Sequence, residues 1–317
     1  MDVNALVGPD LERLETMIAE QLSTDIGSIP AVGKHLLIAG GKRLRPLLAV
    51  LAARATGAPI DIGLVVGCAA ELIHTATLYH DDVVDDGRVR RGRPAARLVF
   101  GNGLVVLVGD YCFAKALGAV ANTDCPAVFK SLAAMVTELT EGEVAQLERA
   151  GNADATVAGY FDVIDRKTAS LISWAARLGG AIPPDYDEIL ASYGRAVGRA
   201  FQIADDILDC MVDGSAAGKT VGRDLREGKM TLPVLLACEA EPSIRTRIRR
   251  ELSELGMSER VAHQILRLVH RAGGLEAAKE RALELVEDAI DQLDALGQSP
   301  FRDALRDIAY LSVERVA

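Results

Sequence analysis

The chain has 317 residues, of which half are hydrophobic and only 4% aromatic, and it carries a net charge of −10 at pH 7. A chain of this length can bury roughly three quarters of its unfolded surface, so it has enough material for a large core. The acidic balance argues against a general nucleic-acid-binding protein, because such proteins normally present a basic face.

Cysteine usage and the N-terminal segment bear on the cellular compartment. The five cysteines are widely spaced and form no CxxC pair, which is typical of reduced, buried thiols in a cytoplasmic protein. The N-terminal segment is acidic and lacks a hydrophobic run, so we expect no signal peptide. No uncharged apolar run approaches the ~18 residues that span a bilayer, so we also expect no transmembrane segment.

Helical patterns run along the chain from its beginning. Apolar residues recur at helical spacing over 11–22, and Pro30 opens a second short helix that stops at Gly40-Gly41. Alanine and leucine dominate, and no alternating strand pattern of convincing length occurs. The sequence therefore predicts an all-α bundle of roughly a dozen helices. No linker divides it, so we expect one domain over residues 1–317, with ligands bound in its core.

Residues 40–46 form a glycine turn, Gly-Gly-Lys-Arg-Leu-Arg-Pro, that carries three cations into a predicted helix over 46–56. Glycines let the backbone approach an anion closely, and the N-terminus of the helix adds partial positive charge. Lys42 and Arg45 are therefore candidates for binding a diphosphate. A basic turn of this kind also occurs as an ordinary solvated loop.

A long predicted helix that starts at Asp61 ends in Asp81-Asp82-Val83-Val84-Asp85. On a helix, Asp81 and Asp85 lie one turn apart on one face, where unpaired like charges repel each other and resist burial. A hard divalent cation resolves this repulsion, because Mg²⁺ binds one or two carboxylates together with phosphate oxygens and water. One such motif alone is more often an acidic helix end that faces solvent.

The same pattern returns as Asp205, Asp206 and Asp209, in a predicted helix over 189–211 that also carries Phe201 and Gln202. Two copies indicate two carboxylate walls that face each other across a metal-bound diphosphate. A purely structural helical protein would have no need of two buried acidic triplets.

Other polar residues flank the two motifs. His74 lies about two turns before Asp81 on nearly the same face, and Glu71 precedes it with the spacing of a di-iron ligand pair. A second Glu-x-x-His does not occur in the sequence, so the di-iron interpretation is set aside. The remaining candidates are a basic loop over 88–94 and a Lys-Thr pair in a predicted helix over 157–179. A third is a loop over 212–228, which we interpret as a lid over the site and which Lys229 follows directly.

Five motifs occur together between Gly40 and Pro233: GGKRLRP, DDVVDDGRVRRG, KTA, FQIADDILD and GKTVGRDLREGKMTLP. In order and spacing they resemble the all-trans polyprenyl (isoprenyl) diphosphate synthase family. The resemblance implies an all-α bundle around a deep central apolar cavity, a homodimer, and Mg²⁺-dependent transfer of prenyl groups. The charged helical remainder over 244–316 carries no recognisable chemistry, and we expect it to serve packing.

The resemblance also implies a role for each matching residue. Metal binding, direct or through water, falls to Asp81, Asp82, Asp85, Asp205, Asp206 and Asp209. Isopentenyl diphosphate would be held by Lys42, Arg45, His74 and Arg91, and the allylic diphosphate by Arg90, Lys167, Lys219 and Lys229. Lys167, Thr168, Gln202 and Lys219 would form the catalytic group, with Phe201 beside the second substrate. Thr220 departs from the family, in which many members have proline.

The expected reaction explains these residue types. Breaking the allylic C–O bond leaves a carbocation and a diphosphate anion, and Mg²⁺, lysine and arginine stabilise the negative charge where it develops. The double bond of isopentenyl diphosphate then attacks the cation, and a proton is lost. Water would quench the cation, so an apolar cavity and a closing lid are required.

Product length is expected to depend on the helix that precedes the first motif. Ala76 and Thr77 project down the same helix face as Asp81, towards the interior. Both are small, which by family resemblance indicates a long-chain, octaprenyl-like product of the kind used for quinone side chains. We expect the floor of the cavity at Ile73 or on the helix over 129–136.

Three alternatives remain open. A short-chain synthase, making farnesyl or geranylgeranyl diphosphate, is the nearest. A terpene cyclase would share an aspartate motif but binds only one diphosphate, so it would not need the Gly-Gly-Lys-x-x-Arg cluster. A non-catalytic subunit of a heteromeric synthase would be expected to lack some of the aspartates or lysines, and this chain lacks none of them.

Overall fold

The structure, a computed structural model, describes residues 3–37, 43–211, 221–253 and 257–316. The predicted all-α fold is confirmed, because the described residues form the helices α1 to α16, with only two strands of two residues each. Contacts between Cα atoms divide the chain into two compact units. The first comprises the described residues within 1–134, 174–191 and 295–305, and the second those within 135–173, 192–294 and 306–317.

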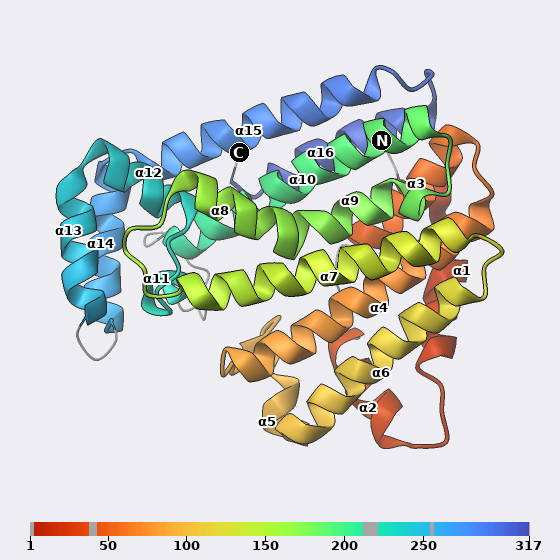
Figure 1. Cartoon of the computed structure of the whole chain (residues 1–317), viewed down its shortest axis with the longest axis horizontal. Coiled ribbons are helices and arrows are strands. Elements are labelled where there is room, and N and C mark those ends of the chain that lie inside the picture. Colours follow the sequence, from red (N-terminus) through yellow and green to blue (C-terminus); the bar gives the residue numbers. More distant parts are fainter. Residues whose placement is uncertain (1–2, 38–42, 212–220, 254–256, 317) are drawn as a thin grey trace. The chain divides into compact units, whose positions relative to one another are not determined.

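The first unit is organised around α4, the helix that ends in the first aspartate motif. Its helices are α1 (Val3–Gln21), α2 (Ser28–Leu37), α3 (Leu44–Thr56), α4 (Ile60–Val84), α5 (Ala96–Phe100) and α6 (Asn102–Ala121). Helix α4 packs along both α3 and α6 (Figure 1). Close approach to α3 depends on Gly63, where an added Cβ would lie 2.8 Å from the Cβ of Ala53. The phenol of Tyr79 fixes α2 by donating to the carbonyl of Val32 at 2.5 Å.

A small hairpin follows α4. Strand β1 (Val89–Arg90) pairs antiparallel with β2 (Arg93–Pro94). The two residues between them have φ values of 51° at Arg91 and 75° at Gly92, as a two-residue hairpin turn requires. Alternation cannot be recognised in strands this short, so the sequence predicts only a loop here.

The second unit contains most of the C-terminal helices. Its elements are the C-terminal part of α7 (Pro126–Arg149), α8 (Val157–Ile164), the π-turn η1 (Asp165–Ala169), the start of α9 (Ser170–Ala176), most of α10 (Pro184–Cys210), α11 (Arg223–Arg226), α12 (Leu232–Ala240), α13 (Pro242–Ser253), α14 (Glu259–Arg271), α15 (Gly274–Leu293) and the end of α16 (Pro300–Val313). The buried helix α12 packs against α13, α14 and α15 (Figure 1).

The predicted continuous helix over 157–179 is wrong in detail, because η1 interrupts it and the 3₁₀ turn η2 (Leu178–Gly180) ends it. Two glycines on neighbouring helices make room for η1. A Cβ on Gly142 of α7 would lie 2.5 Å from the backbone N of Lys167, and a Cβ on Gly198 of α10 would lie 2.7 Å from the Cα of Ala169. The widened turn thus lies directly against two helix backbones.

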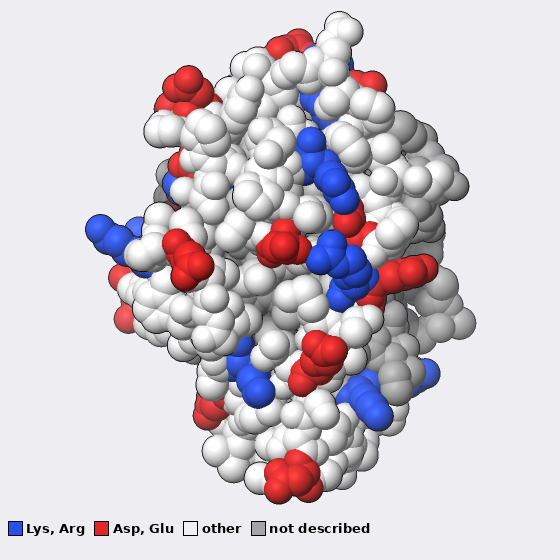
Figure 2. All heavy atoms as spheres, turned by 90° about the vertical axis from the view of Figure 1, so that its right-hand side faces the viewer, with Lys and Arg blue, Asp and Glu red and all other residues white. Residues whose placement is uncertain are grey.

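Two of the described helices are long and apolar enough to span a membrane, which is weak evidence that they do so. In α4 the most apolar window is 72% buried, as in the core helix of a soluble protein, whereas in α6 it is 33% buried. The expectation that no segment crosses a membrane therefore stays a prediction. Figure 2 shows one face on which charged side chains lie singly or in small mixed groups among uncharged ones, without an extended basic patch among the residues described there.

Candidate active site

The first aspartate motif lies at the C-terminal end of α4. Asp82 is only 1% exposed, and its Oδ1 accepts hydrogen bonds from Nε (3.0 Å) and Nη2 (2.6 Å) of Arg90. Its Oδ2 is buried without a hydrogen-bond partner among the described residues. Asp81 and Asp85 are half-buried. The helix dipole places partial negative charge at this end, so three carboxylates here favour a bound cation.

Half-buried His74, on the same helix, lies among arginines. Burial lowers the pKa of His74 well below its usual range, and the charges of four arginines lower it further: Arg45, Arg91, Arg90 and Arg43. The imidazole is therefore neutral and able to donate one hydrogen bond, while the guanidinium groups provide the positive charge. Such a cluster favours a strongly charged anion, and guanidinium forks fit phosphate oxygens.

The guanidinium of Arg43 is held by two carboxylates of the protein and does not depend on a bound anion for its charge partner. Its guanidinium pairs with buried Glu71 and, at 2.7 Å, with Glu15 of α1. Its backbone adopts the left-handed conformation (φ 46°) just before α3. Glu71, which has the spacing of a di-iron ligand in the sequence, thus ties Arg43 to α4. Lys42, which the sequence predicts to bind a diphosphate, lies outside the described residues.

In the second unit, η1 presents Lys167 and Thr168. The Nζ of Lys167 donates to Oε2 of Glu143 at 2.7 Å and to Oε1 of Gln146 at 2.9 Å, both on α7. Thr168 is buried, and its Oγ1 donates to Oε1 of Gln202 at 2.9 Å. The sequence does not single out Glu143 and Gln146, because their function depends on α7 passing η1.

The second motif occupies the last turns of α10. Asp206 is 3% exposed and accepts from the Tyr160 hydroxyl (2.6 Å) and from Nε2 of Gln202 (2.8 Å). The carboxylate of Asp209 accepts from the backbone N–H groups of Arg223 (3.2 Å) and Asp224 (3.1 Å).

Negative charge accumulates around this motif. Burial and the charge of Asp224 raise the pKa of Asp206 well above its usual range, and burial also raises the pKa of Asp209. Burial and the charge of Asp209 raise the pKa of Asp224 to about 6. Mutual repulsion of this kind is relieved by a cation. Asp224 follows a glycine-containing segment. The sequence alone does not indicate that Asp224 lies beside Asp209 of the second motif.

The comparisons with known proteins bear on what these groups do. The family model for polyprenyl synthetase matches residues 28–269. The chain is 38% identical to the octaprenyl diphosphate synthase of Escherichia coli (strain K12) over 316 residues, which cover 99% of this chain and 98% of that protein. The chain belongs to the polyprenyl synthetase family.

Solved structures of polyprenyl synthases agree with this membership. A decaprenyl diphosphate synthase from Rhodobacter capsulatus is 38% identical, with a TM-score of 0.93 over 99% of this chain and 98% of that one. A polyprenyl synthase from Caulobacter crescentus, solved with calcium and isoprenyl diphosphate, is 37% identical, with a TM-score of 0.93 over 99% and 97% of the two chains. The predicted family and the prenyltransferase class are thereby confirmed.

Within this polyprenyl synthetase, the C-terminal residues contribute a contact that the sequence does not suggest. Arg315 Nη2 donates to Oδ1 of Asp205 at 2.6 Å, and its guanidinium lies 5.4 Å from the ring centre of Phe201. Lys229 donates to Oε2 of Glu227 at 2.7 Å. Lys219 lies outside the described residues.

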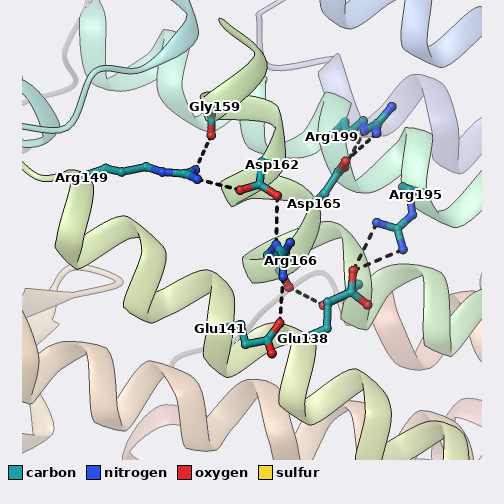
Figure 3. A network of polar contacts seen from close by, with 10 residues as sticks. Glu138, Glu141, Arg149, Gly159, Asp162, Asp165, Arg166, Arg195 and Arg199 are labelled. Atoms are coloured by element: carbon teal, nitrogen blue, oxygen red, sulfur yellow. Dashed lines mark hydrogen bonds and ion pairs between the residues drawn. The ribbon is translucent and has the colours of Figure 1, made fainter. Parts of the chain in front are cut away.

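A network of ion pairs fixes the surroundings of η1 (Figure 3). Asp165 accepts two hydrogen bonds from Arg199 of α10, at 2.5 and 2.6 Å. Arg166 bridges Asp162 of α8 (2.9 Å) and Glu141 of α7 (2.7 Å). Further pairs join Arg149 to Asp162 and Arg195 to Glu138. The turn that carries Lys167 is therefore held from α7, α8 and α10.

The predicted chain-length residues lie on α4 below the first motif. Ala76 and Ile73 are fully buried, and Thr77 is half-buried, with its hydroxyl donating to the carbonyl of His74 at 2.9 Å. No Phe, Tyr or Trp occurs in α4 between Ile73 and Thr77. Which residue forms the floor stays a prediction.

The donor sets fit a hard divalent cation. Each motif offers carboxylate oxygens only, as Mg²⁺ and Ca²⁺ prefer, and Oδ2 of Asp82 is buried with no hydrogen-bond partner in the described part of the chain. Within the described residues, no group of three or more His, Cys, Asp and Glu side chains stands ready to bind an ion by itself. A cation here would need oxygens from phosphate or water to complete its coordination.

Proposed function

We propose that this protein condenses isopentenyl diphosphate with an allylic diphosphate primer, repeatedly and head to tail, to give a long-chain all-trans polyprenyl diphosphate for quinone side chains. The observation that carries the proposal is the junction on α4 of a carboxylate-rich helix end with a cluster of arginines around neutral His74. That junction suits a metal-bound diphosphate together with a second, metal-free one.

The metal is proposed to be Mg²⁺, with Asp81 and Asp85 as its ligands in the first motif and Asp205 as its ligand in the second. When bound, it would stabilise the negative charge of the departing allylic diphosphate. Asp82, Asp206 and Asp209 have buried or hydrogen-bonded carboxylates, so their proposed part is to support the ligands rather than to bind directly.

The cationic side chains exchange partners when the substrates bind. Arg90, Lys167 and Lys229 each pair with a carboxylate in the structure, and the allylic diphosphate replaces or joins that carboxylate. Lys219 completes this set. Arg45, His74, Arg91 and Lys42 hold the diphosphate of isopentenyl diphosphate. Its double bond is thereby placed to attack the allylic cation, as directed by the fixed positions of Thr168 and Gln202.

The growing chain is proposed to run down α4 into a deep apolar cavity, past Thr77 and Ala76 towards Ile73. The small side chains at 76 and 77 let the product pass, which favours a long-chain product over farnesyl or geranylgeranyl diphosphate. Water exclusion by such a cavity protects the cation.

The chain is proposed to act as a cytoplasmic homodimer formed by one large domain. Helix α6 exposes an apolar face that includes Leu107, at 65% exposure, and Leu117, at 37%. Gly103 and Gly118 lie on the same helix with nothing within 4 Å of an added Cβ, so a second copy can approach closely. Apolar faces with small residues are suited to helix packing between subunits.

The test incubates purified protein with Mg²⁺, labelled isopentenyl diphosphate and allylic primers of different lengths. Chromatography of the products is expected to show elongation to one dominant long-chain length. Termination at farnesyl or geranylgeranyl length would establish the short-chain alternative. Absence of incorporation with every primer, under conditions where a known synthase is active, would refute the enzymatic proposal and favour a non-catalytic subunit.

A further inference from the structure

A row of hydrogen bonds in the second unit leads from α8 through α10 to η1. The Tyr160 hydroxyl donates to Oδ2 of Asp206 at 2.6 Å, and Nε2 of Gln202 donates to Oδ1 of the same carboxyl at 2.8 Å. The Oγ1 of Thr168 then donates to Oε1 of Gln202 at 2.9 Å. Tyr160, Asp206 and Thr168 are all less than a tenth exposed.

The hydrogen bonds of the row run in one direction, from Tyr160 and Gln202 to Asp206 and from Thr168 to Gln202. Oδ1 of Asp206 accepts, so the Gln202 amide must turn its NH₂ group to Asp206 and its oxygen to Thr168. The Thr168 hydroxyl has a single hydrogen, and that hydrogen goes to Gln202. Its lone pairs are therefore left for another partner, and they can stabilise positive charge that develops nearby.

We propose that Tyr160 is a positioning residue for prenyl transfer, which fixes Asp206 and thereby makes Thr168 present its lone pairs, rather than its hydrogen, to the allylic carbons. This inference rests on the proposed function, because it concerns the same reacting centre. It adds a residue from α8 that the aspartate motifs do not contain.

The position of Tyr160 suits this task. It lies on α8, which leads directly into η1, so one continuous segment carries both Tyr160 and Thr168. Without the Tyr160 hydroxyl, the buried Oδ2 of Asp206 would lose the hydrogen bond that it accepts at 2.6 Å. A buried carboxyl oxygen without a donor is costly, so Asp206 would rotate towards other donors and the Gln202 amide would follow.

The first test compares Tyr160→Phe with Tyr193→Phe. Tyr193 is fully buried on α10, so its substitution removes a buried phenol hydroxyl from the same unit but outside the row. We expect Tyr160→Phe to lower kcat about tenfold or more while KM for isopentenyl diphosphate stays within about twofold. Tyr193→Phe should keep kcat within about twofold of the wild type. Equal kcat values for the two variants would overturn the proposal.

The second test exchanges the amide of Gln202 and the carboxyl of Asp206 between their two positions. Gln202→Glu sets two carboxyl groups against each other, and Asp206→Asn allows the amide at position 206 to turn either of its groups to Gln202, so both single variants should be slow. In the double variant, the amide at 206 can donate to the carboxylate at 202, which still accepts from Thr168. We expect the double variant to be about tenfold faster than the slower single variant.

A double variant no faster than either single variant would overturn the proposal, and it is the result expected if Asp206 acted only through a metal. This test stands even where Tyr160→Phe folds poorly. Far-UV circular dichroism and heat unfolding of all variants, recorded without metal or substrate, check that the fold is retained. Failure of the proposed function would be recognised separately, because the wild type itself would then elongate no primer.

Discussion

The two aspartate motifs have the same spacing and both end a long helix, yet their surroundings differ. In each, the second carboxyl is buried, with Asp82 at 1% and Asp206 at 3% exposure, while the outer ones are half-buried. Asp82 is neutralised by the guanidinium of Arg90, whereas Asp206 accepts from the uncharged groups of Tyr160 and Gln202. One motif is thus built into a charged anion site and the other into a polar row that ends at Thr168.

This difference teaches that a motif of spacing i, i+1, i+4 does not assign the same task to each of its members. On a helix the second residue is rotated by about 100° from the first and by about 60° from the third, so it can be buried in the protein interior while the other two stay half-buried. The interior then decides its role. With an arginine partner, as at Asp82, the buried carboxylate balances positive charge. With uncharged donors, as at Asp206, it fixes the orientation of neighbouring polar side chains.

The largest effect is expected from removing an outer carboxylate of either motif. Asp81→Ala or Asp205→Ala should lower turnover about 10³-fold or more, because a cation bound at that position loses a ligand and the departing diphosphate loses charge stabilisation. Steady-state rates at saturating Mg²⁺ and substrate measure the loss, and circular dichroism checks the fold. Retained turnover in Asp81→Ala would contradict the assignment of the first motif.

A second, smaller effect concerns the frame of the second motif. Gly142→Ala places a Cβ 2.5 Å from the backbone N of Lys167, so η1 must move away from α7. We expect turnover to fall about tenfold to a hundredfold and the free energy of unfolding to fall by about 1–3 kcal/mol. Chemical denaturation and turnover should change together.

The control is Gly8→Ala in α1, where nothing lies within 4 Å of the added Cβ. There the substitution should leave turnover unchanged and raise the free energy of unfolding by up to about 1 kcal/mol, since alanine favours helix. A Gly142→Ala variant that behaves like this control would show that close packing of α7 on η1 does not matter for the reaction.

The sequence was sufficient for the fold class and for placing the two aspartate motifs on helices, because both rest on local patterns. Helical periodicity located α4 almost to the residue. Tyr160, Glu143 and Arg315 could not be recognised, since each acts through a contact between segments distant in sequence. The π-turn was missed for the same reason, as the glycines that allow it lie on other helices.

The third prediction concerns product length below the first motif. Ala76→Phe puts an aromatic ring on the face of α4 that the growing chain is proposed to follow, and it should shorten the product to about farnesyl or geranylgeranyl length while overall incorporation stays within about tenfold. Chromatography of the products measures the change. Because Ala76 is fully buried, heat unfolding must show a folded variant. An unchanged product ladder from a folded variant would refute the proposed wall.

The smallest effect is a dependence of stability on pH that belongs to the second motif. The pKa of Asp224 is raised to about 6, chiefly by burial and then by the charge of Asp209. Its ordinary value is about 3.9, so between these values the folded protein binds more protons at this carboxyl than the unfolded chain does. Ionisation of Asp224 therefore lowers the stability of the metal-free protein as the pH rises from about 4 to about 6, and the loss persists at higher pH.

Asp224→Asn should remove this loss. At pH 7 and without metal, the variant should unfold about 2–4 °C above the wild type, and most of the difference should be gone near pH 4, where Asp224 is protonated in the folded protein and about half protonated in the unfolded chain. The control Asp124→Asn, at an exposed site, should follow the wild type at both pH values. Added Mg²⁺ and diphosphate should narrow the gap at pH 7, because bound cations satisfy the repelling carboxylates of the wild type. A gap that is equally large at pH 4 and pH 7 would mean that packing, rather than accumulated negative charge, distinguishes this motif from the one on α4.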